Sequence, residues 1–282
     1  MDSRLSRLDI RNKLVESIGG KSEESLSCLK IDKDHTFFFD HEHDHVPGLM
    51  LLEASHQYAE RMLEDATESY VAVMEASFFK FCLFNAPVML SGKRLPSEEG
   101  DKFEIIVTQN GKQRAIVEFL FKKVSRPILR IEGDKSLQPC AAARVNKLRS
   151  ENVMISTPVK CASGKMMCSS LPVNTANLFS DSREMAHPLY LVEAFMQLQR
   201  YINHCSESGR LRDILMGISF NQQQPIDRHC MFDIVADELT EDFGTKHFTR
   251  GAWLKTGDIN FGRCDLHTVR LMTKHKAGEQ HG

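Results

Sequence analysis

The sequence lacks the features that mark several large classes of protein. It contains no apolar run long enough to cross a bilayer, and residues 1–20 contain no continuous apolar segment of the kind found in secretory signals. Its 36 Lys and Arg residues face 38 Asp and Glu residues, and no basic stripe is interleaved with aromatic residues. We therefore expect neither a membrane nor a nucleic acid among its partners.

The eight cysteines lack the spacing of a metal or redox site, because no two of them form a CxxC pair. Scattered cysteines are typical of reduced thiols in a cytoplasmic protein, where many of them serve as small core residues. The sequence therefore predicts a cytoplasmic location and no metal or other cofactor.

What the sequence does contain is an internal repeat. The segments 53–57 and 193–197 both read EAxxQ, and a histidine precedes each of them, at His45 and at His187. Further landmarks follow in the same order in both halves: ASF at 76–78 and ISF at 218–220, Pro87 and Pro225, KFEIIV at 102–107 and MFDIVA at 231–236. Two copies of one fold unit are therefore expected.

The repeat divides the chain into four predicted segments. They are an N-terminal extension with a helix (1–25), a first repeat (26–146), a linker (147–157) and a second, more divergent repeat (158–282). In each repeat a strand and a charged loop precede a long helix, which is apolar on more than one face and should be buried. In the first repeat, strands are expected at 69–84, 102–109, 114–124 and 127–137, with a hairpin turn at 109–112. One helix followed by sequential strands indicates an α+β fold.

The stretch DHEHDH at residues 40–45 permits three interpretations. It resembles the HxHxDH signature of the metallo-β-lactamase superfamily, but it is one residue too compact and the later histidines lack the matching context, so we expect no metal. Alternatively, Asp44 caps the following helix by accepting hydrogen bonds from its free N–H groups. The third interpretation is a functional pocket.

Glu53 favours the pocket, because it lies well inside an apolar helix. Burying an ionised carboxylate is costly unless it is paired or its pKa rises. A structural Arg or Lys partner is one explanation for it. The recurrence of a carboxylate at Glu193, with a histidine before each glutamate, favours a functional site.

The stretch HVPGLMLLEA at residues 45–54 resembles the A-factor biosynthesis hotdog family, the γ-butyrolactone synthases of actinomycete signalling. The resemblance is close over residues 44–54, and the repeat extends it over most of the chain. It implies a tandem (double) hotdog, in which each repeat is a long central helix wrapped by an antiparallel sheet. The two sheets would form an intramolecular pseudo-dimer, as a monomer or within a homo-oligomer.

The resemblance also implies a reaction. Family members are similar in being acyltransferases that move a β-ketoacyl group from an acyl-carrier-protein thioester to dihydroxyacetone phosphate, giving an ester that leads to a butenolide or γ-butyrolactone signal. The expected partners are therefore a carrier-protein-bound or CoA-bound β-ketoacyl substrate and a small phosphorylated acceptor. A dehydratase or thioesterase on the same fold, or a non-catalytic acyl-binding protein, remains an alternative.

The residues suit such chemistry. Amides at Gly48 and Leu49, in the first helical turn, can donate to a thioester carbonyl. Imidazole titrates near neutrality, so His45 is suited to take a hydroxyl proton. Glu53 would orient the substrate, or act as acid or base if burial raised its pKa. Gln57, one turn further on the same helix face, would hydrogen-bond Glu53 or the substrate, unless it is a core polar group satisfied by the backbone. The second repeat offers His187, Glu193 and Gln197 for these roles, and Asp44 is a further substrate-binding candidate.

By analogy with hotdog dehydratases, the sites are expected to be composite, with His45 facing Glu193 and His187 facing Glu53. The second copy lacks the Asp and the Gly of the first, so its ability to bind an oxyanion is in doubt and one working site is a possible outcome. An Arg often precedes the Gln of EAxxQ in the family, but His56 and Met196 stand there in this chain. If that Arg binds phosphate, then Lys80, Lys93 and Arg94 are conceivable substitutes.

Overall fold

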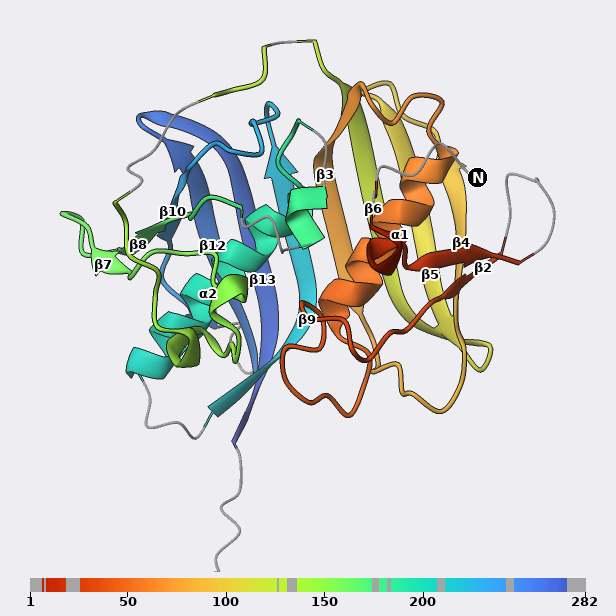
Figure 1. The fold of residues 1–282 in the computed structure, drawn as a ribbon, viewed down its shortest axis with the longest axis horizontal. Helices are drawn as coiled ribbons and strands as arrows, with labels where there is room; N and C mark the ends of the chain where they lie inside the picture. Colours follow the sequence, from red (N-terminus) through yellow and green to blue (C-terminus); the bar gives the residue numbers. More distant parts are fainter. Residues whose placement is uncertain are drawn as a thin grey trace, which may run out of the picture.

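The computed structural model describes residues 7, 9–18, 26–125, 127–130, 136–173, 178–181, 184–206, 211–241 and 246–272. Over these residues thirteen strands form one antiparallel sheet, and two α-helices lie against it, which confirms the α+β class (Figure 1). The strands are β1 (Val15–Ser17), β2 (Ser27–Leu29), β3 (Ser69–Phe78), β4 (Val88–Leu95), β5 (Asp101–Gln109), β6 (Lys112–Lys123), β7 (Val159–Lys160), β8 (Met166–Ser169), β9 (Leu211–Gln222), β10 (Asp233–Ala236), β11 (Thr240–Glu241), β12 (His247–Thr256) and β13 (Ile259–Met272).

The strand order divides the sheet into two halves that meet at its centre. The order is β1-β2-β4-β5-β6-β3-β9-β13-β12-β10-β8-β7, with β11 pairing beside β12. At the seam, Ala76 of β3 pairs with Ile218 of β9, and these are the residues that begin the ASF and ISF landmarks. The two landmark segments therefore pair with each other across an antiparallel seam.

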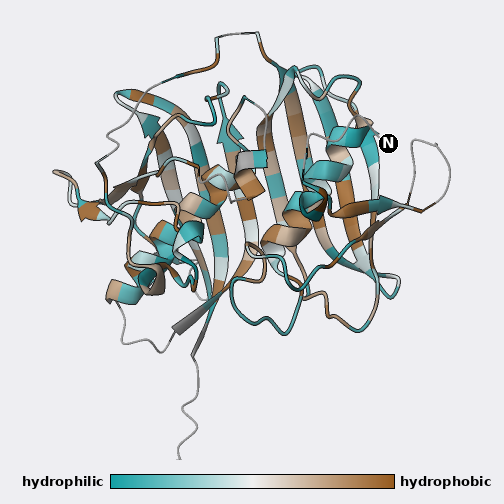
Figure 2. Ribbon diagram, in the orientation of Figure 1, coloured by the Kyte–Doolittle hydropathy of each residue, from teal (hydrophilic) through white to brown (hydrophobic). Residues whose placement is uncertain are grey.

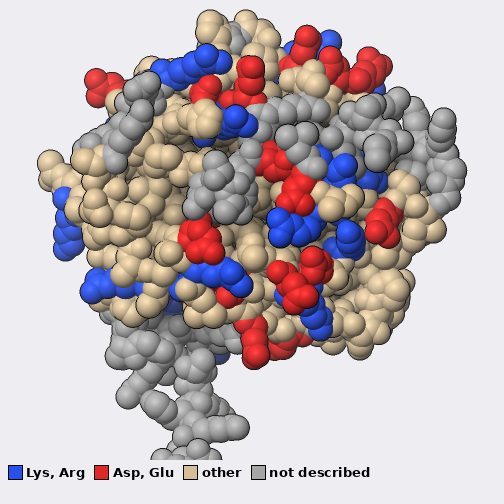
Figure 3. Space-filling view, in the orientation of Figure 1, with Lys and Arg blue, Asp and Glu red and all other residues tan. Residues whose placement is uncertain are grey.

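Each half carries one helix. Helix α1 (Gly48–Met62) packs on β4, β5 and β6, and α2 (Pro188–Ser206) packs on β8, β10 and β13. The strands alternate apolar and polar residues, so that one face of the sheet buries its side chains under the helices (Figure 2). No helix in the described part of the chain is long and apolar enough to cross a membrane. On the face shown in Figure 3, acidic and basic side chains are interspersed among the described residues.

Burial of α1 is as predicted, and it includes polar residues. Glu53, Gln57, His56 and Glu60 are buried together with Met50, Leu52, Ala54 and Tyr58. The predicted hairpin is also confirmed, because Asn110 and Gly111 connect β5 to β6 with φ angles of 54° and 68°.

Strand β4 was not predicted from the sequence. Gly92, Lys93 and Arg94 interrupt its apolar pattern, but Gly92 is needed because a Cβ there would lie 2.7 Å from the Tyr58 ring of α1. The strand expected at 127–137 is reduced to an isolated bridge at Leu129, and residues 131–135 lie outside the described part of the chain.

The helix predicted within residues 1–25 is wrong over the residues that the structure describes there. Ile10–Asn12 form a short 3-10 helix, and Val15–Ser17 form β1, which pairs with β2 at the edge of the sheet. The prediction rested on four leucine and isoleucine residues at near-helical spacing within this segment. They favour a helix less than the pairing with β2 favours a strand. A second 3-10 helix, Ser150–Asn152, lies within the predicted linker, so the extension and the linker contain matching elements.

Two reciprocal hydrogen bonds connect the two halves. Asn12 Nδ2 donates to Asp181 Oδ2 (3.0 Å), and Asn152 Nδ2 donates to Asp40 Oδ1 (2.8 Å). All four residues are buried. Each 3-10 segment therefore holds the loop that precedes the helix of the other half, and these loops carry the candidate site residues.

Candidate active site

Gln57 fixes the first EAxxQ segment to the chain that precedes it. Its Oε1 accepts a hydrogen bond from Leu14 N (2.9 Å), and its Nε2 donates to Asn12 O (2.6 Å). The same Nε2 donates to Glu53 Oε1 (2.7 Å). Gln57 therefore satisfies the backbone of the 3-10 segment and orients the buried carboxylate, and it does not line the cavity described below.

Gln197 makes the corresponding bonds in the second half. It accepts from Met154 N (2.9 Å) and donates to Asn152 O (2.8 Å) and to Glu193 Oε1 (3.1 Å). The backbone partners lie 43 and 45 residues before the glutamine in both halves. The repeat therefore extends upstream to the segments that sequence reasoning assigned to the extension and the linker.

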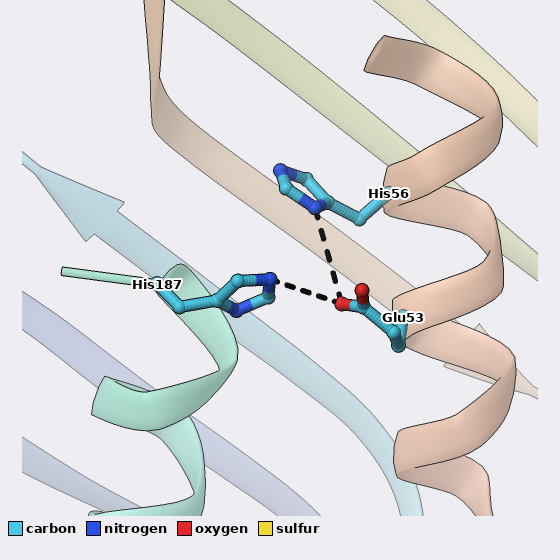
Figure 4. Close-up of side chains that lie close together, drawn as sticks. All are labelled: Glu53, His56 and His187. Carbon is cyan, nitrogen blue, oxygen red and sulfur yellow. Dashed lines mark ion pairs between the residues drawn. The ribbon is translucent and has the colours of Figure 1, made fainter. Parts of the chain in front are cut away.

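The structure places His187 against Glu53, across the two halves (Figure 4). His187 Nε2 lies 3.0 Å from Glu53 Oε2, and His56 Nδ1 lies 4.0 Å from the same oxygen. Arg7 Nε donates to Glu53 Oε1 at 2.8 Å. Glu53 is fully buried, so this cluster is sealed from solvent.

The guanidinium of Arg7 sets the charge state of the sealed cluster. Burial alone would raise the pKa of Glu53, but the positive charge of Arg7, followed by the interaction with His187, outweighs it and holds that pKa well below its usual range. Burial lowers the pKa of His56 to about 4. Glu53 is therefore ionised at neutral pH, which is the opposite of the shift that a general acid at this position would need.

Glu53, His56 and His187 also have the composition of a metal site, with ligand atoms within 4.8 Å of one another. Arg7 already supplies a cation there, since its Nη2 lies 2.6 Å from His187 Nε2 and 3.3 Å from His56 Nδ1. Leu189 N donates to His187 Nδ1 (3.1 Å), so this ring nitrogen is not open to a metal either. The cluster therefore fits an ion-paired hub better than a metal centre.

Glu193 lies in the corresponding cluster of the second half. Its Oε1 contacts Lys147 Nζ at 2.9 Å and Arg200 Nη1 at 3.1 Å, while its buried Oε2 has no hydrogen-bond partner among the described residues. Burial raises the pKa of Glu193, but Lys147 and Arg200 outweigh it and bring that pKa to about 2. Glu193 is therefore also ionised, and Lys147 holds the position that Arg7 holds in the first cluster.

The two clusters differ in their access to a cavity of 1090 Å³. One wall consists of the loop at residues 40–45 (DHEHDH) and the start of α1. Its lining residues include Asp44, His45, Gly48 and Leu49. A second wall comes from α2 and from the residues around the 3-10 helix Ala142–Val145. Lys147 and Arg200 line this wall, whereas Glu193 lies behind them, and neither Glu53 nor His187 reaches the cavity.

His45 faces the cavity with a carboxylate behind it. Asp44 Oδ1 lies 2.5 Å from His45 Nδ1, and the His45 ring packs on Phe81 with ring centroids 4.0 Å apart. Asp44 is therefore engaged with His45 and does not cap α1, whose preceding residue Pro47 makes no side-chain capping bond. The expected contact between His45 and Glu193 is not present among the described residues; the nearby imidazole is that of His41, whose pKa is lowered by burial and by Lys147 and Arg200.

The two helix starts differ. The N–H groups of Gly48 and Leu49 have no hydrogen-bond partner among the described residues, and both residues line the cavity. In α2, Pro188 has no N–H and the N–H of Leu189 is taken by His187. Only the first helix therefore presents free donors to a ligand.

The two helix starts differ in their free N–H donors because the two histidines occupy different positions. The amides of Val46 and Ala186 make matching 2.8 Å bonds to the carbonyls of Cys82 and Ile226, in the segments that follow β3 and β9, so Val46 and Ala186 are equivalent. His187 then stands at the position of Pro47, and His45 lies two residues earlier.

Sequence reasoning missed the cations that pair with the glutamates. Arg7 lies 46 residues before Glu53, and Lys147 has the same spacing before Glu193. The segments RLDIRN and KLRSEN, at 7–12 and 147–152, share a basic residue, a leucine and an asparagine at matching places. That weak similarity is the sequence signal that could have identified the two cations.

Comparisons with known proteins agree with this architecture. Residues 4–124 match the model of the A-factor biosynthesis hotdog domain. A curated relative, the 2-oxo-3-(phosphooxy)propyl 3-oxoalkanoate synthase of Streptomyces virginiae, is 28% identical over 81 residues, which is 28% of this chain and 27% of that protein. The match thus spans about a quarter of the relative's length.

Solved structures resemble the chain over nearly its whole length. The acyl-CoA thioesterase II TesB2 of Mycobacterium marinum has a TM-score of 0.55 at 11% identity, covering 96% of this chain and 99% of that one. The dehydratase domain from the CurJ module of curacin polyketide synthase has a TM-score of 0.59 at 12% identity, also covering 96% and 99%. At such identities the likeness shows the fold alone, and with the family match it shows a hotdog fold.

Proposed function

Residues 4–124 belong to the A-factor biosynthesis hotdog family, and from this premise we propose that the chain is an acyltransferase. It would transfer a β-ketoacyl group from a carrier-protein or CoA thioester to a hydroxyl of a small phosphorylated acceptor such as dihydroxyacetone phosphate, in the synthesis of a butenolide or γ-butyrolactone signal. The observation that carries the proposal is the cavity in which the Asp44–His45 pair and the free amides of α1 lie on one wall. The relative's name, which describes a phosphooxypropyl ester of a 3-oxoalkanoate, supports it.

The proposal includes a tandem double hotdog that forms an intramolecular pseudo-dimer. The pairing of Ala76 with Ile218 and the matching glutamine bonds support two copies of one unit. All eight cysteines are free, which fits the reducing compartment of the cytoplasm.

His45 is the proposed base. Asp44 accepts the Nδ1–H of His45, which leaves Nε2 to take the proton of the acceptor hydroxyl. The acceptor oxygen then attacks the thioester carbon, and the amides of Gly48 and Leu49 stabilise the resulting oxyanion. Collapse of this intermediate breaks the C–S bond, and His45 returns its proton to the leaving thiolate.

The two glutamates take different parts in this proposal. Glu193 positions Lys147 and Arg200 at the cavity wall, which it can do only while ionised. Glu53 and His187 form the sealed hub between the halves, which favours one working site. His187 also occupies the amide of Leu189, so the second helix start has no equivalent donor for an oxyanion.

The test is acyl transfer by the purified chain. With a β-ketoacyl carrier-protein or CoA donor and dihydroxyacetone phosphate, we expect a phosphorylated ester in the mass spectrum and one thiol released for each ester formed. His45→Ala should lower the rate by about 10²- to 10⁴-fold, the value of a general base. His229→Ala, at an exposed histidine outside the cavity lining, is the matched control and should leave the rate unchanged.

Other outcomes separate the alternatives. Thiol release at the same rate without an acceptor would contradict acyl transfer and favour a thioesterase. Loss of water from a β-hydroxyacyl thioester would favour a dehydratase. Donor binding without turnover of either kind would favour a non-catalytic acyl-binding protein.

A further inference from the structure

The cavity wall formed by α2 and by the residues around Ala142–Val145 is cationic. Arg144, Lys147 and Arg200 all line it. Lys147 and Arg200 share Glu193 Oε1, at 2.9 and 3.1 Å, so their charges lie close enough to meet one anion. One carboxylate against three cations leaves this wall with a net positive charge.

Two further acidic residues of the lining, Asp40 and Asp213, are paired with other groups. The carboxylate of Asp40 accepts hydrogen bonds from the amides of Leu148 and Arg149 (2.7 and 3.1 Å) as well as from Asn152. Asp213 is paired with Arg270, whose Nε lies 2.9 Å from its Oδ1. Both carboxylates are committed to partners other than the three cations of the wall.

Several polar groups at this wall lack partners. Arg200 contacts Glu193 through Nη1, and its Nε and Nη2 have no hydrogen-bond partner among the described residues. Gln199 lines the cavity and is 5% exposed, yet its Oε1 has no partner there either. Buried polar atoms are nearly always hydrogen-bonded, so the unpartnered oxygen of Gln199 points to a missing ligand with a hydroxyl. The Arg200 side chain is partly exposed at the cavity, and its remaining N–H donors are open to an anionic group of the same ligand.

We propose that this wall is the acceptor subsite, in which Arg200, Lys147 and Arg144 bind the phosphate of a polyol phosphate and Gln199 accepts a hydrogen bond from one of its hydroxyls. The inference rests on the proposed acyl transfer and deepens it. Because the cations and His45 line the same cavity, a phosphate held by Arg200 keeps the hydroxyl of a three-carbon acceptor in the cavity that contains the base. A guanidinium is suited to this role, since its fixed N–H groups match phosphate oxygens.

A second pair of cations lines the cavity near its exposed rim. Lys80 and Arg114 lie there, beside the exposed Phe79 and Phe81, and the Nε of Arg114 is buried without a partner among the described residues. A phosphate on the acyl donor could bind at this rim. The experiment must therefore separate an anion on the acceptor from an anion on the donor.

The first arm measures binding without any acyl donor. Isothermal titration calorimetry with sn-glycerol 3-phosphate should show binding to the wild-type chain, and Arg200→Gln should weaken it by about 10- to 100-fold, as expected for a charged hydrogen bond. Arg263→Gln is the matched control, because Arg263 also contacts a carboxylate (Asp265, 2.8 Å) but lies outside the cavity lining. No binding by the wild-type chain, or equal binding by Arg200→Gln, would overturn the subsite.

The second arm uses Gln199→Leu, which guards against a folding artefact. Removing an unpartnered buried oxygen should leave the melting temperature unchanged or higher, while glycerol 3-phosphate binds several-fold more weakly. Unchanged affinity would show that Gln199 takes no part. If Arg114→Gln rather than Arg200→Gln weakened glycerol 3-phosphate binding, the subsite would lie at the rim and the assignment to α2 would be wrong.

The kinetic arm distinguishes the subsite from the reaction. Arg200→Gln should raise the KM for dihydroxyacetone phosphate by a larger factor than the KM for the acyl donor. Phosphate binding that depends on Arg200 in a chain without acyl transfer would keep the subsite and refute the reaction. Acyl transfer whose acceptor KM ignores Arg200 would keep the reaction and refute the subsite.

Discussion

The Glu53 cluster and the Glu193 cluster are built on the same frame and differ in what surrounds it. In both, a glutamine of EAxxQ orients the glutamate, and a cation that lies just before a 3-10 helix pairs with it. Arg7 completes a closed hub with His56 and His187, whereas Lys147 and Arg200 open onto a cavity. A buried carboxylate therefore does not identify an active site by itself; the accessibility of its partners does.

The largest expected contrast is between the two histidines. His187→Ala should retain acyl transfer to within about threefold when scaled to folded protein, against the 10²- to 10⁴-fold loss expected for His45→Ala. His187→Ala should instead lower the melting temperature, because it removes the Leu189 cap and a partner of Glu53. Parallel assays and thermal unfolding of the two variants check this. Loss of activity at an unchanged melting temperature would place His187 in the catalytic machinery.

The next contrast is between the two cations. Arg7→Met leaves Glu53 buried without a permanent cation, which should cost about 3–5 kcal/mol of unfolding free energy. Lys147→Met leaves Arg200 on Glu193, so its cost should be smaller, about 1.5–3 kcal/mol. Urea denaturation of both variants measures the difference. Equal losses would contradict this expectation, because they would mean that Arg200 does not compensate for the loss of Lys147.

His56 of the first cluster and Glu193 of the second should affect stability in different pH ranges. His56 has a folded pKa of about 4 against an ordinary value of 6.5, so the unfolded chain binds its proton first and stability is lost as the pH falls from 6.5 to 4. Glu193 has a folded pKa of about 2 against 4.5, so its contribution is present above pH 4.5 and is lost below it.

Unfolding free energies measured from pH 7 to pH 3 test this order. Relative to the wild-type chain, His56→Gln should reduce the slope between pH 6.5 and 4, and Glu193→Gln should reduce it only below pH 4.5. A His56→Gln profile parallel to that of the wild-type chain above pH 4 would contradict the proposed charge state of the sealed cluster.

The smallest effect is expected at Arg94, which sequence reasoning offered as a phosphate ligand together with Lys93 and Lys80. Arg94 is ion-paired with Asp101 and Lys93 with Glu104 at the surface, and neither lines the cavity, whereas Lys80 does. Arg94→Gln should change stability by at most about 1 kcal/mol and leave the acceptor KM unchanged. A raised acceptor KM in this variant would move the anion site away from α2.

Local patterns predicted the parts of the fold that local physics determines. The apolar faces of α1, the alternation in β5 and β6 and the turn at Asn110-Gly111 follow from side-chain periodicity and turn geometry. Strand β4 escaped because Gly92 and two charges break its pattern, although the close contact with Tyr58 requires that glycine.

The candidate site was predictable only in part. The EAxxQ repeat and its histidines located both carboxylates, but the ion pairs that set their charge join residues far apart in the chain, such as Arg7 and Glu53. No periodicity encodes such a contact. His45 lies two positions earlier in its repeat than His187 does in the other. This difference depends on the length of the loop before the helix, which the shared landmarks do not reveal.

The most direct test of the central claim is a crystal structure of the chain with a non-hydrolysable β-ketoacyl amide analogue of the thioester donor. The account predicts the acyl chain in the 1090 Å³ cavity, with its carbonyl oxygen within hydrogen-bond reach of the Gly48 and Leu49 amides and its carbonyl carbon near the face of His45. An analogue bound instead at Glu53 and His187, with Arg7 displaced, would contradict it.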